Sequence, residues 1–332
     1  MIGRRAVLGM AFGLAACGPR GAFFVEPGMT AGRRTQPVMM VRPTAAGLDA
    51  TRIDVSMPAD RSPGRLDWAG PGAFAVADSQ ALDRAGFLEN LAAAPPSDAP
   101  VTVFIHGYNS RPAEAVYRLA QMAEDFDEEG PSVAFVWPST ATALGYIADR
   151  DASLRSRDAL ADLLTMLARS QDRPIALVAH SMGGFLTMET LRQMALADEL
   201  PRDRLGAVIL ISPDVDIDLF RSQARAIGRL PQPFVITVSD RDRALGVSAR
   251  LAGRRARLGA PDDLSRLADL DITVIDLSAA NDDGGNRHLS AVTSPTAIAW
   301  LNALDASPGA WQDRTGIGLL ELPLSQALSV LR

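Results

Sequence analysis

The strongest constraint on the fold is an alternation of two patterns that runs from residue 101 to residue 304. Short, uninterrupted apolar runs alternate with longer segments in which apolar residues recur at helical spacing. Strands that are apolar on both faces are typical of a parallel sheet covered by helices on both sides. The predicted strands are 101–105, 132–137, 174–179, 205–211, 234–238 and 272–277, and the predicted helices are 112–129, 151–170, 185–197, 217–226, 243–252 and 295–304. The sequence therefore predicts an α/β fold with a mostly parallel central sheet.

Both ends of this series are extended by weaker patterns. Three more extended runs, at 37–41, 52–57 and 73–77, are separated by turn-forming Pro and Gly residues. We therefore expect one α/β domain over residues 37–305. In the tail, 306–332, leucines recur at helical spacing, which predicts a short amphipathic helix docked on the domain rather than a membrane anchor. These leucines are Leu320, Leu324, Leu328 and Leu331.

The first 36 residues have the composition of an export signal followed by a tether. Arg4 and Arg5 precede an apolar run over 6–16, which is typical of a secretory signal and shorter than the roughly 20 residues that span a bilayer. The sequence Leu-Ala-Ala-Cys ending at Cys17 resembles the bacterial lipoprotein cleavage box. That resemblance implies removal of residues 1–16, a lipid on Cys17, and a membrane-anchored protein of the bacterial cell envelope that faces the periplasm. A plain signal peptide is the alternative, and the Gly-, Pro- and Arg-rich segment 17–36 is expected to be a tether.

The composition excludes several classes of chemistry. All 33 basic residues are Arg, so no lysine can form a Schiff base or bind phosphate. With one Cys and three His, neither a thiolate zinc site nor a His-rich metal site is expected, and we expect no cofactor. The acidic pI of about 5.2 argues against a nucleic-acid partner. The remaining candidates for catalysis are Ser, Asp, Glu, Arg and the few His.

Ser181 has the sequence context of a nucleophile. It lies between the predicted strand 174–179 and the helix at 185–197, with Ala179 and Gly183 two residues away on either side. Small residues at these positions allow the sharp strand–turn–helix turn that exposes a nucleophilic serine. The start of the helix favours negative charge that develops there. The alternative is that Ser181 only caps the helix, and the adjacent His180 is expected to be structural.

A second loop is a candidate for stabilising an oxyanion. His106, Gly107, Tyr108 and Asn109 follow the predicted strand 101–105. In folds with such a serine turn, a loop at this place donates a backbone N–H to the oxyanion, so the predicted donors are the amides of Tyr108 and Met182. Gly107 allows the backbone to approach a substrate closely. His106 precedes the nucleophile in the sequence, so we assign it a hydrogen-bonding role in the loop and a possible place in the substrate pocket.

The acid and the base are predicted from later loops. His288 is the only histidine downstream of Ser181, in a polar loop that follows the last predicted core strand, and is the candidate base. Asp240 and Asp242 both follow the strand at 234–238. Asp242 is preferred because it directly precedes the predicted helix at 243–252, and Asp214 is the third choice.

Several stretches together resemble the α/β-hydrolase superfamily, and more narrowly a bacterial esterase/lipase-like family of unknown function. They are VFIHGYNS from residue 103, FVWPS from 135, GYIADRDA from 145, LVAHSMG from 177, SPDVD from 212 and VSDRDRAL from 238. The resemblance implies an α/β-hydrolase fold with Ser181 as nucleophile, Asp242 as acid and His288 as base. The chain departs from it where the family carries a Gly-His pair, because His288 here follows Asn286 and Arg287.

These observations predict a serine hydrolase, specifically a carboxylic ester hydrolase that acts through an acyl-enzyme. The expected partner is a small ester or acyl substrate, and the expected contact with a membrane is through the lipid on Cys17. The segments inserted over the site, 138–150 and 214–233, are short, and the first supplies Tyr146 as a possible pocket residue. The alternatives are a thioesterase, an amidase or a phospholipase on the same triad, or a non-catalytic envelope lipoprotein that uses the scaffold for binding.

Overall fold

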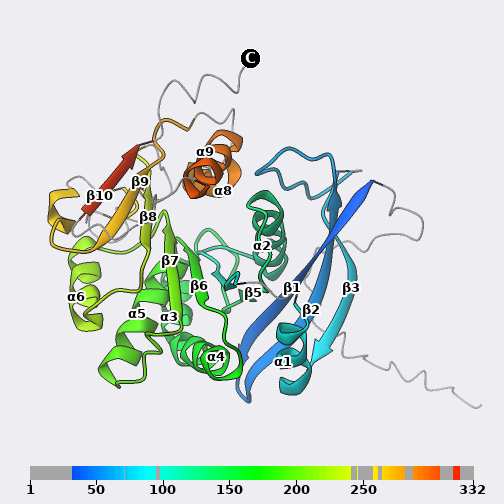
Figure 1. Cartoon of the computed structure of the whole chain (residues 1–332), viewed down its shortest axis with the longest axis horizontal. Helices are drawn as coiled ribbons and strands as arrows, with labels where there is room; N and C mark the ends of the chain where they lie inside the picture. The colour runs from blue at the N-terminus through cyan, green and yellow to red at the C-terminus, as the bar shows by residue number, and fades with distance from the viewer. Residues whose placement is uncertain are drawn as a thin grey trace, which may run out of the picture.

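The computed structural model of the protein describes residues 32–70, 72–94, 98–240, 245, 257–260, 264–280, 287–306 and 317–321. Their strands form one ten-stranded sheet in the order β10-β9-β8-β7-β6-β4-β5-β1-β2-β3 (Figure 1). The strands are β1 (Arg33–Thr44), β2 (Gly47–Pro58), β3 (Ala75–Leu82), β4 (Val101–Ile105), β5 (Ser132–Phe135), β6 (Ile175–His180), β7 (Leu205–Ile211), β8 (Phe234–Val238), β9 (Ile272–Asp276) and β10 (Ile317–Glu321).

From β3 onward, helices alternate with these strands along the chain. They are α1 (Arg84–Ala92), α2 (Pro112–Asp125), α3 (Tyr146–Arg155), α4 (Arg157–Ser170), α5 (Met182–Leu196), α6 (Ile217–Ile227), α8 (Ser290–Thr293) and α9 (Pro295–Asp305), with short 3-10 helices η1 (Leu264–Leu267) and η2 (Arg287–Leu289). The predicted helix at 243–252 lies outside the described residues, apart from Leu245.

The sheet is parallel from β10 through to β1, and only β2 and β3 join it antiparallel. Strands β4, β5, β6 and β8 are buried along their whole length, as expected of strands covered on both faces. The predicted fold class, an α/β fold with a mostly parallel central sheet, is therefore confirmed.

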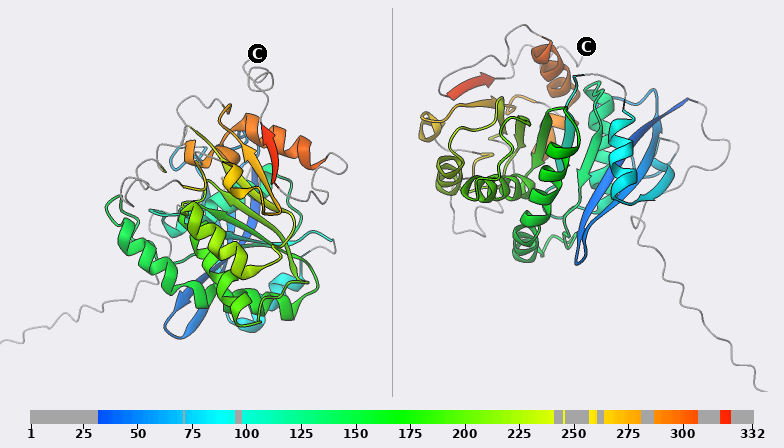
Figure 2. Two further views of the ribbon diagram at one scale, coloured as in Figure 1. Left: turned by 90° about the vertical axis from the view of Figure 1, so that its left-hand side faces the viewer. Right: turned by 60° about the horizontal axis from the view of Figure 1, so that its bottom comes forward.

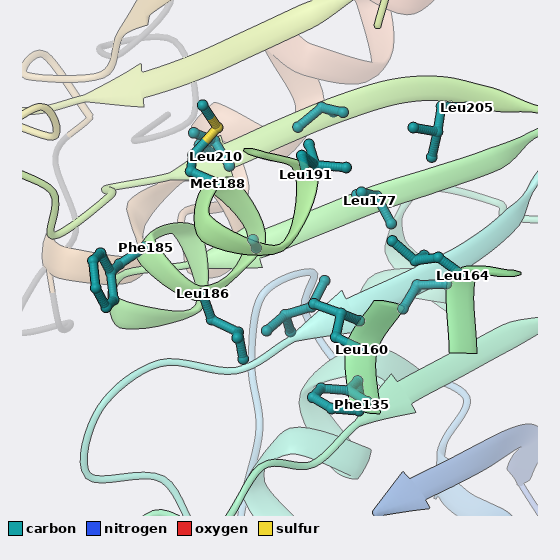
Figure 3. Packing of buried hydrophobic residues seen from close by; sticks show 14 of the residues in the cluster. Phe135, Leu160, Leu164, Leu177, Phe185, Leu186, Met188, Leu191, Leu205 and Leu210 are labelled. Atoms are coloured by element: carbon teal, nitrogen blue, oxygen red, sulfur yellow. The ribbon is translucent and has the colours of Figure 1, made fainter. Parts of the chain in front are cut away.

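The helices cover both faces of the sheet and enclose two hydrophobic cores. One core joins the sheet to α1, α3, α4, α5 and α6, and the other joins it to α2, α8 and α9. In Figure 1 the first group lies in the lower part of the view and the second in the upper part, with the sheet between them, as the turned views of Figure 2 also show. Figure 3 shows the first core, where leucines of α4 and α5 pack on β6 and β7.

The single helix predicted over 151–170 is two helices, α3 and α4, and α3 begins earlier than expected. The break lies at Ser156, whose hydroxyl donates to the carbonyl of Ala152 at 2.8 Å. A serine that bonds back to the carbonyl four residues earlier commonly bends a helix. The result is that α3, which starts at Tyr146, is a separate helix that packs against α5.

The ends of the domain also differ from the predictions. Strand β1 begins at Arg33, inside the segment predicted as a tether, and the Arg33 guanidinium donates to the Ser56 hydroxyl at 2.8 Å and to the Ala73 carbonyl at 2.6 Å. Leu320, which was predicted to lie in a helix, lies in β10, parallel to β9. An apolar run of this length fits either element, and pairing with the edge of β9 decides in favour of the strand.

The remaining predictions for the two ends of the chain concern residues that the structure does not describe. Leu324, Leu328 and Leu331 lie outside the described residues, as do the predicted signal segment 1–16 and Cys17. Among the described residues there is no helix with the length and hydropathy of a membrane span.

Candidate active site

Ser181 occupies a strained turn between β6 and α5. Its backbone has φ 53° and ψ −118°, a conformation that costs free energy for a residue with a side chain and that is often found at functional sites. Its N–H donates to the carbonyl of Ile211 on the neighbouring strand at 3.0 Å. In the described structure the Ser181 side chain makes no capping hydrogen bond to α5, so its hydroxyl is not used as a helix cap.

Gly183 is required by the close approach of this turn to β4. A Cβ at Gly183 would lie 2.3 Å from the carbonyl oxygen of Ile105 and 2.5 Å from that of His106. Because both of these oxygens belong to the backbone, no side-chain rotation can make room. The small residue at this position is therefore necessary for the first turn of α5 to pack against the end of β4.

The loop that follows β4 lies directly against the nucleophile turn. A Cβ at Gly107 would lie 2.6 Å from Nδ1 of His180 and 2.9 Å from Cβ of Ser181. The predicted oxyanion donors are thus on neighbouring segments: Tyr108 follows Gly107, and Met182 is the first residue of α5, where backbone N–H groups have no partner within the helix.

His106 is part of the internal bonding of this loop. Its Nδ1 lies 2.9 Å from the Gly107 carbonyl and its Nε2 lies 3.0 Å from the Trp137 carbonyl, while the Trp137 indole N–H donates to the His106 carbonyl at 2.8 Å. The two rings stack with centroids 4.7 Å apart. Burial lowers the pKa of His106 to about 4, so the ring is neutral at pH 7. With only 2% of the residue exposed, the ring offers almost no surface to a substrate, which argues against its predicted place in the pocket.

His288 lies beside the nucleophile turn, on η2. Its ring centroid is 4.6 Å from that of His180, in an edge-to-face arrangement, and Nε2 of His180 lies 3.2 Å from the His288 carbonyl oxygen. Burial, and then the neighbouring His288, hold the pKa of His180 well below its usual value, so His180 is neutral and can donate its Nε2–H to that carbonyl. His180, the residue directly before Ser181, is therefore hydrogen-bonded to the backbone of the predicted base.

The three candidate acids are placed differently. Asp242, the preferred acid, lies outside the described residues. Asp240 is exposed, and its N–H donates to the Ser278 hydroxyl at 2.9 Å. The carboxylate of Asp214 is directed toward other partners, since Oδ2 accepts from the Tyr146 hydroxyl at 2.9 Å and Oδ1 pairs with Nε of Arg257 at 3.2 Å.

Tyr146 lies beside the predicted oxyanion loop. Its ring meets the ring of Tyr108 edge to face, with centroids 5.5 Å apart, and it lines a narrow pocket with Met182, Phe185 and Asp214. Burial, and then the Asp214 carboxylate, raise the pKa of the Tyr146 phenol well above its ordinary value. Tyr146 is therefore a protonated donor next to the site at pH 7.

Asp149 is not among the site residues predicted from the sequence. This residue lies on α3, is completely buried, and accepts hydrogen bonds from the N–H groups of Asn109 and Thr140 and from the hydroxyl of Ser139. Its one signal in the sequence is its position in the GYIADRDA stretch. Among the described residues, no group of three or more His, Cys, Asp or Glu is arranged to hold a metal ion.

Comparisons with known proteins agree with this fold. Residues 84–304 match the family model described as alpha/beta hydrolase of unknown function (DUF900). An uncharacterised protein of Nostoc, alr1448, is 38% identical over 63 residues, which are 19% of this chain and 16% of that protein.

Solved structures with a similar fold include two hydrolases. The dienelactone hydrolase of Anabaena variabilis has 14% identity, a TM-score of 0.39 and coverage of 86% of this chain and 100% of that chain. An esterase of Pyrobaculum calidifontis has 13% identity, a TM-score of 0.38 and coverage of 81% and 84%. The family match covers most of the sheet and every described element of the site, and on that basis the chain belongs to the family of alpha/beta hydrolases of unknown function.

Proposed function

We propose that the protein is a serine hydrolase that cleaves carboxylic esters, with Ser181 as nucleophile, His288 as base and Asp242 as acid. The observation that carries the proposal is the strained backbone of Ser181, φ 53°, at a turn packed against the 106–109 loop. Strain of this kind persists only where the surrounding structure imposes it, and here it holds a serine hydroxyl at the carboxyl edge of the sheet.

The proposed reaction has two halves. The hydroxyl oxygen of Ser181 attacks the ester carbonyl while its proton passes to His288, and Asp242 holds the imidazole in the required tautomer. The amides of Tyr108 and Met182 stabilise the oxyanion. Collapse of the intermediate breaks the C–O bond and His288 protonates the leaving alcohol. Water, activated by His288, then hydrolyses the acyl-enzyme and releases the acid.

The proposed substrates are esters with short or medium acyl chains. The segment at 138–150 forms a short loop and the start of α3 rather than an additional domain, and Leu144 on it is 99% exposed. Hydrolysis of a thioester, an amide or a phospholipid would use the same catalytic groups. The rates of hydrolysis of esters, thioesters, amides and phospholipids therefore show which substrate class the protein prefers.

A fluorophosphonate probe tests the proposed function directly, because it labels an activated serine whatever the natural substrate is. Wild-type protein is expected to be labelled once, at Ser181, and Ser181→Ala is expected to lose the label. Ser212 supplies a matched control, since it is also buried, has a positive φ of 43° and follows the neighbouring strand. Ser212→Ala should keep the label. An unlabelled wild-type protein would refute the proposal and favour a non-catalytic binding scaffold. Full labelling of Ser181→Ala would refute Ser181 as the nucleophile.

We also propose that the protein is exported and anchored in the bacterial cell envelope, facing the periplasm, by a lipid on Cys17. The support is the sequence alone, namely the basic and apolar segment that precedes Cys17. Fractionation of cells that express wild-type protein and Cys17→Ser tests it: the wild type should be in the membrane fraction and the variant should be released from it.

A further inference from the structure

The carboxylate of Asp149 joins two segments that meet at the predicted site. Its Oδ2 accepts from the backbone N–H of Asn109 at 3.1 Å and from the Ser139 hydroxyl at 2.6 Å, and its Oδ1 accepts from the backbone N–H of Thr140 at 2.5 Å. The residue is completely buried on α3. A buried carboxylate is stable only where its oxygens are hydrogen-bonded, and here two of the three donors are backbone groups of loops.

One of these loops carries the predicted oxyanion donor Tyr108. Asn109, whose N–H bonds to Asp149, has a left-handed backbone with φ 55°, so the chain turns sharply just after Tyr108. On its other side the loop is fixed at Gly107, where there is no room for a Cβ beside His180 and Ser181. The Tyr108 amide therefore lies between a contact with the nucleophile turn and a hydrogen bond to α3.

Helix α3 holds the same loop at a second point and is itself tied to the nucleophile turn. The Tyr146 ring contacts the Tyr108 ring, and the Tyr146 hydroxyl donates to Asp214 at 2.9 Å. The backbone N–H of Asp214 in turn donates to the Ser181 carbonyl at 3.2 Å. The position of α3 is thus linked both to the oxyanion loop and to the serine that it serves.

We infer that Asp149 is a positioning residue for the oxyanion loop and sets the location of the Tyr108 amide relative to Ser181. The inference rests on the proposed hydrolase function. Two oxygens are needed at this place, because the three donors approach both of them. An asparagine has one carbonyl oxygen, so Asp149→Asn turns an N–H₂ group toward the donors of the other oxygen and leaves at least one backbone N–H unbonded. Either the Asn109 N–H or the Thr140 N–H then lacks a partner, so the two loops are no longer held together through this side chain.

The test compares Asp149→Asn with a matched control, Asp125→Asn. Asp125 is also a buried carboxylate with three donors, because it accepts from Arg61 at 2.5 Å, from the N–H of Gly64 at 2.6 Å and from Gln121, but it lies on α2, in the other core. Both variants should melt at lower temperature. Only Asp149→Asn should lower kcat on p-nitrophenyl butyrate, by about 100-fold, with KM within about threefold, because misplacing a group by about 1 Å can cost that much.

The affinity for a transition-state analogue distinguishes a positioning role from a purely structural role. Binding of an alkyl trifluoromethyl ketone, which forms an oxyanion on the serine, should weaken in Asp149→Asn by the same factor as kcat falls, and should be unchanged in Asp125→Asn. If Asp149→Asn does not fold, Ser139→Ala tests the same inference, because it removes one donor to the same Oδ2. It should lower kcat in the same direction, by about threefold to tenfold.

The outcomes separate the inference from the proposed function. If wild-type protein neither hydrolyses the ester nor reacts with a fluorophosphonate, the proposed function fails and the inference fails with it. If wild-type protein is active and Asp149→Asn has the kcat of Asp125→Asn, the inference alone is overturned. An increase in kcat in Asp149→Asn would also overturn it, because it would mean that the carboxylate charge acts mainly by opposing the oxyanion.

Discussion

Substituting Gly183 by Ala perturbs the proposed site at a contact whose size the structure gives. The new Cβ would lie 2.3 Å from the Ile105 carbonyl oxygen, about 1 Å closer than an ordinary contact, and 2.5 Å from that of His106. Either α5 or the end of β4 must move by about this amount. Since these two segments carry Ser181 and the predicted oxyanion loop, we expect kcat to fall about 100-fold, the cost of a misplacement of this size.

The neighbouring Gly184 isolates the effect of the clash. A Cβ there would lie 3.2 Å from the Cβ of Pro213, a contact that a shift of a few tenths of an ångström relieves. Both alanines gain about 1 kcal/mol of helix propensity, but at Gly183 overpacking costs about 1–3 kcal/mol. Gly184→Ala should therefore keep kcat within about threefold and be the more stable of the two.

Hydrolysis of p-nitrophenyl butyrate and thermal melting of both variants provide the measurement. The prediction is a large difference in kcat between two adjacent substitutions of the same kind in one helix. Equal activity of Gly183→Ala and Gly184→Ala would show that the strand–helix contact does not set the geometry of the site, and the reasoning would fail.

Burial lowers the pKa of His106 to about 4, so between about pH 6.5 and pH 4 the unfolded chain binds a proton at His106 that the folded chain does not. About 3 kcal/mol of the free energy of unfolding present above pH 6.5 should therefore be lost as the pH falls to about 4. Urea unfolding of His106→Gln should show a smaller loss over the same range. Arg257→Met leaves the buried carboxylate of Asp214 without its ion-pair partner and should cost about 3–5 kcal/mol in urea unfolding, part of which Asp214→Asn in the same chain should restore. If Asp242 is the acid, Asp242→Asn should lower kcat by about 10⁴-fold while Asp240→Asn stays within about tenfold of wild type, and the reverse order would move the acid to Asp240.

The fold could be predicted where strands are apolar on both faces and end at clear turn residues. The predicted limits of the strands 101–105, 205–211 and 234–238 match β4, β7 and β8 residue for residue. Helix α1 was not predicted, because it has no regular apolar stripe and buries only Phe87 and Leu91. Its start depends on a local cap, in which the Asp83 side chain accepts from the N–H of Gly86.

The sequence could predict which loops lie near one another, but it could not predict every side chain that holds them in place. Residues that follow parallel strands meet at one edge of the sheet, so the sequence could indicate that the loops of His106, Ser181 and His288 lie close together. The role of Asp149 could not be predicted in this way. Its partners are mainly backbone N–H groups of two loops, and no residue type in the sequence marks which carboxylate those groups will meet.

The place of β1 in the sheet has a consequence for synthesis of the chain. Strand β1 pairs on one side with β2, which follows it after a tight turn, and on the other side with β5, whose residues 133–135 are made about 90 residues later. Until then the β1–β2–β3 meander has an open edge along the buried, apolar residues 39–41. Exposed apolar edges are sites of association between chains. A nascent or truncated chain that ends before β5 should therefore self-associate, which light scattering of a fragment ending at residue 100 would detect, whereas a fragment that includes β5 covers that edge.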